Sequence, residues 1–252
     1  MSLVTTPAVL LRSYPYGESS RILRFFSRDA GLVGVMAKGI RKSMALGGSG
    51  LESFVGGTLT FYMRSTRDLQ TFKEFAPLKR RRGLGAGALR LGGASIVAEL
   101  VLKHAGEEAN EPLFAAVDEA LDRIEGCPEA SVIASALSGA WGVVNALGYA
   151  PILESCVHCA APLGLEETGR FDFSAGGVRC VRCSTQGGGP RVGPGARAQL
   201  RTLVMGEATP SPLLRPRAHL QLLSDFVTHH VSGATPLESF AFLARLVPDD
   251  HA

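Results

Sequence analysis

The sequence predicts a multidomain α+β protein, in which a small barrel of five strands precedes a helical domain with a four-cysteine insert. Three observations support this prediction. The spacing of apolar residues changes from two to about 3.6 near Gly83. Two Cys-x-x-Cys pairs interrupt the helical part, and the parts differ in charge. The chain has 252 residues, 46% of them apolar, which suffices for several small cores.

Residues 7–78 show the alternation and the frequent turn residues that are typical of short strands. Five strands in so short a segment favour a closed barrel, because closure removes exposed sheet edges. Among five-stranded barrels the OB-fold is the natural expectation, and we assign it residues 1–80. The expected strands are 8–13, 20–27, 32–40, 57–63 and 69–76.

The charge of the chain is unevenly distributed. Residues 1–82 carry 14 Lys/Arg against 5 Asp/Glu, net +9; residues 83–155 carry 3 against 10, net −7; residues 156–252 carry 9 against 8, net +1. The basic first segment indicates a polyanionic partner, and its alternative is a merely solvated surface. Arginine and lysine grip phosphates, and aromatic side chains can stack on bases. The candidate nucleic-acid contacts are Tyr14, Lys38, Arg41, Lys42, Arg64, Lys73, Lys79, Arg80, Arg81 and Arg82.

From Gly83 onward the pattern is helical. Residues 83–93, rich in glycine, suggest a loose linker or a weak helix start, and Asn110 is a plausible N-cap of the second helix. Thr235 and Glu238 have the spacing of a capping box, with proline at the first helical position. The helical domain comprises residues 81–155 and 186–252, and its helices are expected around 96–101, 113–124, 133–147, 198–204, 214–231 and 237–247.

The insert, residues 156–185, carries the most specific chemistry in the chain. Cys156 and Cys159 form one pair, and Cys180 and Cys183 form the other. Four thiolates at this spacing can surround one Zn²⁺ and leave no open position, so we predict a zinc ribbon with a single structural zinc. The alternatives are two disulfides, redox-active pairs, or a ligand role for His158. Disulfides require an oxidising compartment, and the N-terminus has no signal-peptide pattern.

Sequence motifs of catalysis are not found. The chain lacks a P-loop, a G-x-S-x-G elbow and an H-E-x-x-H motif. It has no apolar run of about 18 residues, so we do not expect it to span a membrane. We therefore expect a binding protein and not an enzyme. A metal-dependent nuclease or hydrolase is a weaker alternative, since no open metal site or convergent carboxylate cluster is recognisable.

In this order of parts the chain resembles the RecO family of recombination mediators. The matching segments are 11–23, which reads LRSYPYGESSRIL, and 31–42, which reads GLVGVMAKGIRK. The four cysteines and the late segment 237–243 also match. Within the second segment Lys38, Arg41 and Lys42 correspond to the basic barrel motif of the family.

The resemblance implies a bacterial cytoplasmic protein that associates with the nucleoid during DNA repair in the RecF pathway. Similar proteins bind single- and double-stranded DNA and anneal complementary strands. They also contact the acidic C-terminal tail of single-stranded-DNA-binding protein and act with RecR to load the recombinase RecA. Such a tail would need an apolar pocket with an arginine, for which Arg123 is a guess.

The rival hypothesis is a zinc-ribbon adaptor whose basic N-terminus binds RNA or a protein. The sequence also leaves open whether the zinc ribbon touches DNA through Arg179 and Arg182, which lie in and beside its second cysteine pair.

Overall fold

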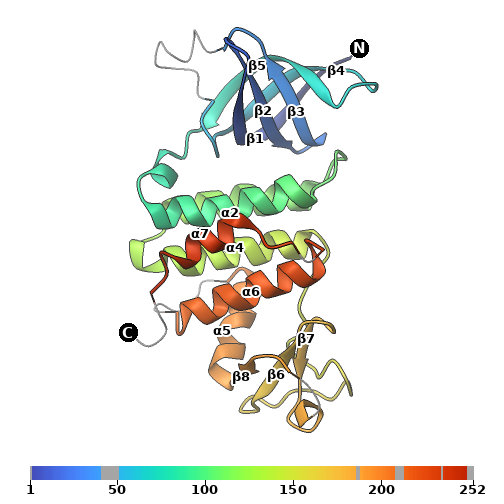
Figure 1. Cartoon of the computed structure of the whole chain (residues 1–252), viewed down its shortest axis with the longest axis vertical. Coiled ribbons are helices and arrows are strands. Elements are labelled where there is room, and N and C mark those ends of the chain that lie inside the picture. The colour runs from blue at the N-terminus through green and yellow to red at the C-terminus, as the bar shows by residue number, and fades with distance from the viewer. Residues whose placement is uncertain (1, 41–50, 186–187, 208–212, 234, 249–252) are drawn as a thin grey trace.

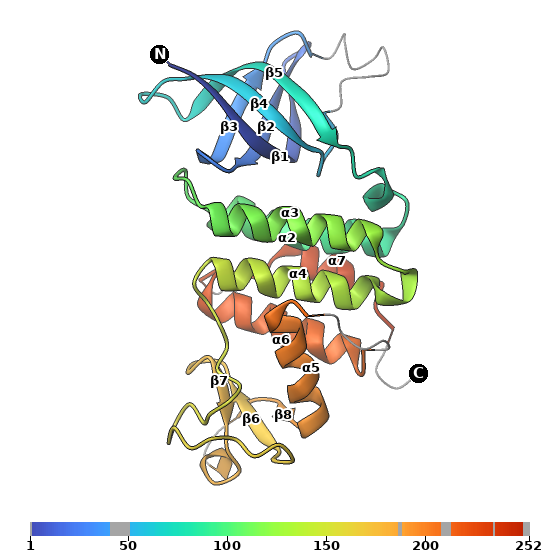
Figure 2. The ribbon, with the colours of Figure 1, turned by 180° about the vertical axis from the view of Figure 1, so that it is seen from behind.

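The computed structural model describes residues 2–40, 51–185, 188–207, 213–233 and 235–248. The barrel lies at one end, the helices in the middle, and a small sheet with the four cysteines at the other end (Figure 1 and Figure 2). We call this last part, residues 156–192, the cysteine module. The candidate contacts Arg41 and Lys42 lie outside the described residues.

The five predicted strands of the N-terminal part are confirmed. They form a closed barrel in the order β1-β2-β3-β5-β4, and β1 also pairs with β4. All neighbouring pairs are antiparallel except β3 with β5, which is parallel. The strands are β1 (Ser2–Tyr16), β2 (Ser20–Ser27), β3 (Gly31–Ala37), β4 (Gly56–Met63) and β5 (Leu69–Lys79).

Strand β1 is longer than predicted, because its first half pairs with β4 and its second half with β2. Inside the barrel Leu10 lies opposite Phe25, and both are fully buried. The register then shifts between Leu10 and Arg12, as in a β-bulge, so that Arg12 lies opposite Arg24. Neither arginine belongs to the barrel core. Beyond the bulge, Arg12 and Arg24 therefore share the outer surface of the barrel.

In the described part of the chain, six α-helices make up the middle of the molecule. The predicted N-cap is confirmed, since the Asn110 side chain accepts a hydrogen bond from Leu113 N at 3.0 Å. The helices are α2 (Ala88–His104), α3 (Glu111–Gly126), α4 (Val132–Ala146), α5 (Pro194–Met205), α6 (Pro216–His230) and α7 (Glu238–Ala244). The cysteine module between α4 and α5 contains β6 (Gly169–Asp172), β7 (Gly177–Arg179) and β8 (Arg191–Val192), in the order β7-β6-β8.

The glycine-rich start of the helical domain is not a loose linker. After a short 3₁₀ turn, η1 (Arg82–Gly85), helix α2 begins at Ala88 and includes Gly92 and Gly93, both buried. A Cβ atom on Gly93 would lie 2.6 Å from Ala136 Cβ in α4. These glycines therefore permit close helix packing, and the cost of glycine in a helix is offset by contacts that the sequence pattern does not reveal.

The predicted capping box is also wrong. Helix α7 begins at Glu238, so Thr235 lies outside it, and no side chain of its own first turn caps it. The carboxylate of Glu99 in α2 accepts hydrogen bonds from Glu238 N at 3.2 Å and from Ser239 N at 2.8 Å. A partner from another helix thus satisfies the free N–H groups.

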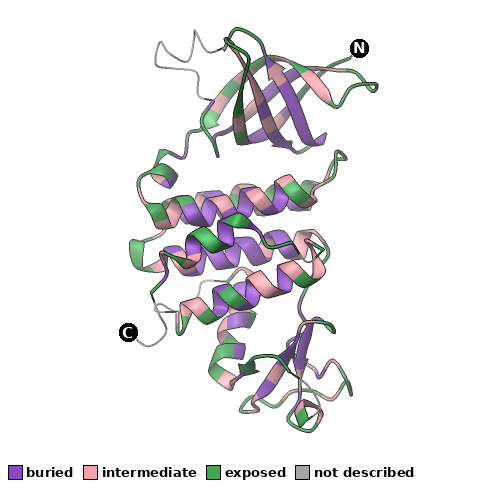
Figure 3. Ribbon diagram, in the orientation of Figure 1, coloured by how far each residue is buried: buried purple, intermediate pink, exposed green. Residues whose placement is uncertain are grey.

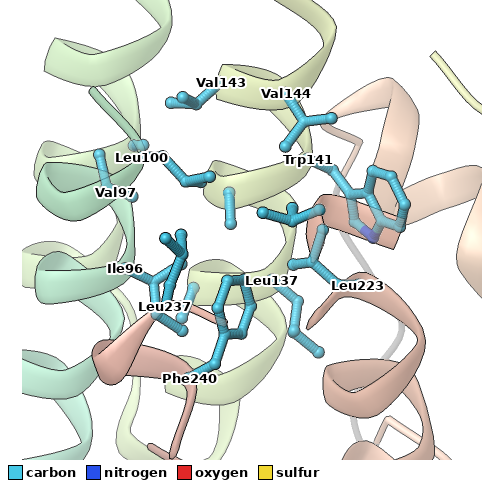
Figure 4. Packing of buried hydrophobic residues seen from close by; sticks show 14 of the residues in the cluster. Ile96, Val97, Leu100, Leu137, Trp141, Val143, Val144, Leu223, Leu237 and Phe240 are labelled. Carbon is cyan, nitrogen blue, oxygen red and sulfur yellow. The ribbon is translucent and has the colours of Figure 1, made fainter. Parts of the chain in front are cut away.

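One apolar core extends from the outer face of the barrel through the helices to the cysteine module. It includes Phe26 of β2, Trp141 of α4 and Phe171 of β6. Buried residues face one another between the helices (Figure 3), and Trp141 and Leu137 meet Leu223 in the close view (Figure 4). Among the described residues, no helix is both long and apolar enough to cross a bilayer.

Candidate metal centre and nucleic-acid interface

The four predicted metal ligands come together in the cysteine module. Cys156 and Cys159 precede β6, and Cys180 directly follows β7. The four sulfur atoms, including that of Cys183, all lie within 4.8 Å of one another, and Cys159 Sγ is 3.8 Å from Cys180 Sγ. A tetrahedral metal with bonds of about 2.3 Å to sulfur requires sulfur atoms about 3.8 Å apart. The cluster is therefore positioned to hold a metal ion.

Two similar backbone turns direct the sulfurs toward one point. In the first pair Ala160 N donates to Cys156 O, and in the second Ser184 N donates to Cys180 O, each at 2.9 Å. Ala160 adopts a left-handed conformation with φ 56° to close its turn. In addition His158 N lies 3.4 Å from Cys156 Sγ and donates to it, which favours the thiolate.

The surroundings shift the pKa values of Cys156 and Cys183. Burial opposes ionisation of Cys156, but backbone N–H groups of Cys180, Cys159 and His158 lower the pKa of this thiol to about 6. Hydrogen bonds to Cys180 and Cys159 raise the pKa of Cys183 to about 12. Four thiolates at this separation repel one another, and a cation among them removes that repulsion.

His158, the alternative metal ligand, and Arg179, a candidate DNA contact of the insert, both lie against Asp172. This buried carboxylate pairs with Arg179, whose Nε lies 2.6 Å from Asp172 Oδ2. His158 Nε2 is 3.4 Å from the same oxygen, so His158 is directed to Asp172 and is not part of the sulfur cluster. The Arg179 side chain is only 12% exposed, whereas Arg182 is exposed.

All five cysteines have free thiols, so the structure gives no support to the disulfide alternative.

The cysteine module is anchored to the helices. The Phe171 ring lies 6.1 Å from that of Phe226 in α6, which lies 5.1 Å from Trp141 in α4. Arg197 of α5 donates to backbone carbonyl oxygens in the loop before β6, namely those of Gly164, Leu165 and Glu167. A disturbance of the metal ligands can therefore reach the helical core.

The barrel presents a second candidate site on its outer surface, which we call the β1–β2 face. It consists of Arg12, Tyr14, Ile22 and Arg24. The Arg12 guanidinium lies over the Tyr14 ring at 5.5 Å, and Tyr14 is 40% exposed. Gly34 of β3 lies beside Arg24, where a Cβ atom would be 3.0 Å from its guanidinium. The arrangement offers two cations and an aromatic ring to a phosphate backbone.

Sequence reasoning found Tyr14 on this face but missed Arg12 and Arg24. Arg12 is two residues from Tyr14, and Arg24 is two residues from Ile22. A period of two could therefore have placed the members of each pair on one face. Their juxtaposition depends on the bulge in β1, which the sequence does not signal.

Most of the other predicted contacts lie on the surface. Lys38 follows β3, Arg64 begins the turn between β4 and β5, and both are exposed. Lys73 is exposed and pairs with Glu74 at 3.8 Å. Arg80 and Arg82, beyond β5, are exposed as well.

Arg81 is buried and does not lie on the surface, which corrects its prediction as a nucleic-acid contact. Its side chain is 1% exposed and donates to Asp118 and to Asp122 of α3 and to Phe54 O. Arg81 is the N-cap of η1 and has a left-handed backbone conformation with φ 43°. Lys79 Nζ also binds both aspartates, each at 2.6 Å, although its side chain is 46% exposed.

Comparison with known proteins gives the family. Residues 1–81 match the model of the recombination protein O N-terminal domain, and residues 88–238 match that of the C-terminal domain. The chain belongs to the RecO family. Proteins named DNA repair protein RecO are similar over most of their length. The one from Rubrobacter xylanophilus is 32% identical, covering 94% of this chain and 96% of the relative; that from Pelotomaculum thermopropionicum is 31% identical, covering 97% and 95%.

Membership of the RecO family supports a role in DNA repair and recombination. It also places both candidate sites within matched regions, since the β1–β2 face lies in the N-terminal match and the four cysteines lie in the C-terminal one.

This RecO-family chain also contains a cavity of about 890 Å³ between α5, α6 and β8. Its walls are largely apolar, with Leu200, Leu214 and Leu222 among them, and the charged residues Arg191, Arg215 and Asp225 also line it. Arg123, the predicted arginine of a tail pocket, instead donates to Ser138 Oγ and Gly206 O at 3.1 Å and ties α3 to the end of α5.

Proposed function

We propose that this protein is a recombination mediator without enzymatic activity. It binds single- and double-stranded DNA, anneals complementary strands, and helps load a recombinase onto protein-coated single strands. The barrel, residues 1–80, acts as an OB-fold for DNA, the helices form a second domain in two parts, 81–155 and 186–252, and residues 156–185 form a zinc ribbon. A cytoplasmic location with recruitment to the nucleoid during repair follows from this role.

The observation that carries the proposal is the opposition of Arg12 and Arg24 beside Tyr14 on the β1–β2 face. Annealing requires that two polyanions approach each other, and cations held at fixed positions reduce their repulsion. The strand order with a parallel β3–β5 pair supports the OB-fold assignment. OB-folds bind oligonucleotides on the face of their second and third strands, and Arg24 of β2 lies there opposite Gly34 of β3. Lys38, Arg64, Lys73, Arg80 and Arg82, with Arg41 and Lys42 by family resemblance, extend the proposed contacts.

The metal of the cysteine module is proposed to be one structural Zn²⁺. A set of four cysteines suits zinc and leaves no position for a substrate. The far location of the module from the barrel favours a role in folding, with no contact to the DNA on the β1–β2 face.

The proposed protein partners are RecR and the acidic C-terminal tail of single-stranded-DNA-binding protein. The cavity between α5 and α6 is the better place for such a tail, because it combines apolar walls with Arg191 and Arg215. Arg123 lines a separate cavity of about 530 Å³, where its guanidinium donates to Ser138 Oγ and Gly206 O. We favour the cavity between α5 and α6 because its walls are more apolar.

Strand annealing tests the proposal. Labelled complementary oligonucleotides, bare or coated with single-stranded-DNA-binding protein, are mixed with the protein at two salt concentrations. We expect acceleration without ATP that weakens with salt and persists on coated strands. No acceleration, together with no DNA binding at low salt, would favour the adaptor alternative, in which the chain binds RNA or a protein.

A further inference from the structure

Two acidic residues of the helical domain, Asp118 and Asp122, form ion pairs with Lys79 of the barrel. Lys79 ends β5, and its Nζ donates to Asp118 Oδ2 and Asp122 Oδ2 in α3, each at 2.6 Å. The side chain remains 46% exposed, and the neighbouring Arg80 and Arg82 are exposed too. The carboxylates therefore hold one member of an accessible basic cluster.

The two aspartates divide their oxygens between two cations. Oδ1 of Asp122 accepts from the buried Arg81 Nε at 2.7 Å, and Oδ1 of Asp118 accepts from Arg81 as well. Oδ2 of each accepts from Lys79. The Oδ1 contacts join the barrel to α3 beneath the surface, and the Oδ2 contacts lie at the surface.

We propose that Asp118 and Asp122 limit the affinity of this protein for DNA by holding Lys79 in place of DNA phosphates. This proposal rests on the proposed DNA binding and assigns the two aspartates a role in setting its strength. Carboxylate and phosphate oxygens accept the same ammonium hydrogen bonds, so a DNA strand that reaches this end of the barrel competes with them. The two aspartates belong to the same chain and stay close to Lys79, whereas DNA phosphates must displace them to bind it.

The division of oxygens provides a sharp test. In Asp122→Asn the amide keeps one oxygen that can accept from Arg81, but an NH₂ group replaces the oxygen that holds Lys79. The same holds for Asp118→Asn. Each variant should therefore weaken the hold on Lys79, because one of its two carboxylate partners is lost, while retaining an acceptor for the buried arginine. Glu119→Gln is the matched control, since Glu119 is exposed on the same helix and the substitution removes the same charge.

DNA binding is measured by fluorescence anisotropy with a labelled single strand over a series of salt concentrations. We expect Asp122→Asn to tighten binding roughly twofold to fivefold at low salt and to steepen the salt dependence by about 0.7 in slope. Glu119→Gln should change affinity less and leave the slope unaltered. Lys79→Ala in the Asp122→Asn background should abolish the gain.

The outcomes are distinguishable. Equal tightening by Asp122→Asn and Glu119→Gln would show a general charge effect and overturn the proposal, as would unchanged binding in both aspartate variants. If the wild type itself does not bind DNA, the proposed function fails first. Thermal unfolding of each variant identifies a loss of folding, and Asp118→Asn then serves as the second, independent variant.

Discussion

Trp141 packs against Phe226 with ring centroids 5.1 Å apart and planes tilted by 57°, and Phe226 in turn meets Phe171 of β6. Trp141 is the single tryptophan of the chain and is fully buried in α4. A short aromatic path thus connects the strand of the cysteine module with the centre of the helical core. A structural change at the metal site can therefore alter the surroundings of Trp141.

Removal of the metal should change the fluorescence of Trp141. We expect about one zinc per chain by elemental analysis, and a shift of the emission spectrum when a strong chelator is added, because loss of the ligands loosens Phe171. Cys156→Ser with Cys159→Ser should lose the metal, whereas Cys127→Ser, which changes the one cysteine outside the cluster, should retain it. A wild type without zinc, whose thiols all react freely, would contradict the metal assignment.

Loss of the two arginines on the β1–β2 face should weaken DNA binding. Arg12→Ala with Arg24→Ala should reduce affinity for all sequences alike and flatten the salt dependence by roughly 0.7 for each single-strand contact. Arg201→Ala, which removes an exposed charge from α5, is the control. Anisotropy titrations with two unrelated sequences provide the measurement. An unchanged slope in the double variant would remove this face from the proposed function.

Arg80 and Arg81 should behave in opposite ways despite being neighbours. Arg81→Ala should destabilise the fold by about 1–3 kcal/mol, since it removes the buried guanidinium that binds Asp118, Asp122 and Phe54 O, while the two partly exposed carboxylates regain water. Arg80→Ala should leave the unfolding free energy within about 0.5 kcal/mol and weaken DNA binding. Urea unfolding together with DNA titration checks both. Comparable stability of the two variants would contradict the burial argument.

Two glycines of the helical domain should respond differently to alanine. Gly93→Ala should cost about 1–3 kcal/mol, because its Cβ would lie 2.6 Å from Ala136 Cβ. Gly142→Ala should stabilise by about 0.5–1 kcal/mol, since no atom lies within 4 Å of a Cβ there and alanine favours the helix. Thermal unfolding distinguishes the two, and a stabilising Gly93→Ala would show that the helices can separate at little cost.

The junction of barrel and α3 should be sensitive to acid. Burial opposes the charge on Asp122, but hydrogen bonds from Arg81 and Lys79 lower the pKa of its carboxyl below the ordinary 3.8. Its contribution to stability is therefore complete above about pH 4 and is lost as the pH falls through the folded-state value. The difference in unfolding free energy between wild type and Asp122→Asn should be constant above about pH 5 and should shrink as the pH falls below about 4.

The sequence by itself determined the chemistry that depends on local spacing. Period-two alternation located the five strands, and a period near 3.6 located the helices, because burial of one face imposes these repeats on any chain. Asn110 signals a helix start by its own side chain, and two Cys-x-x-Cys pairs carry their ligand geometry within each turn. Family resemblance added the recombination role.

Only the tertiary structure decided the fate of residues whose partners are distant in sequence. Arg81 belongs to a run of basic residues, yet it is buried because Asp118 and Asp122 lie beneath it. Glu99 caps α7 from another helix, and the bulge in β1 brings Arg12 opposite Arg24. Composition counts charges, but whether a charge meets solvent or a carboxylate depends on packing between elements far apart along the chain.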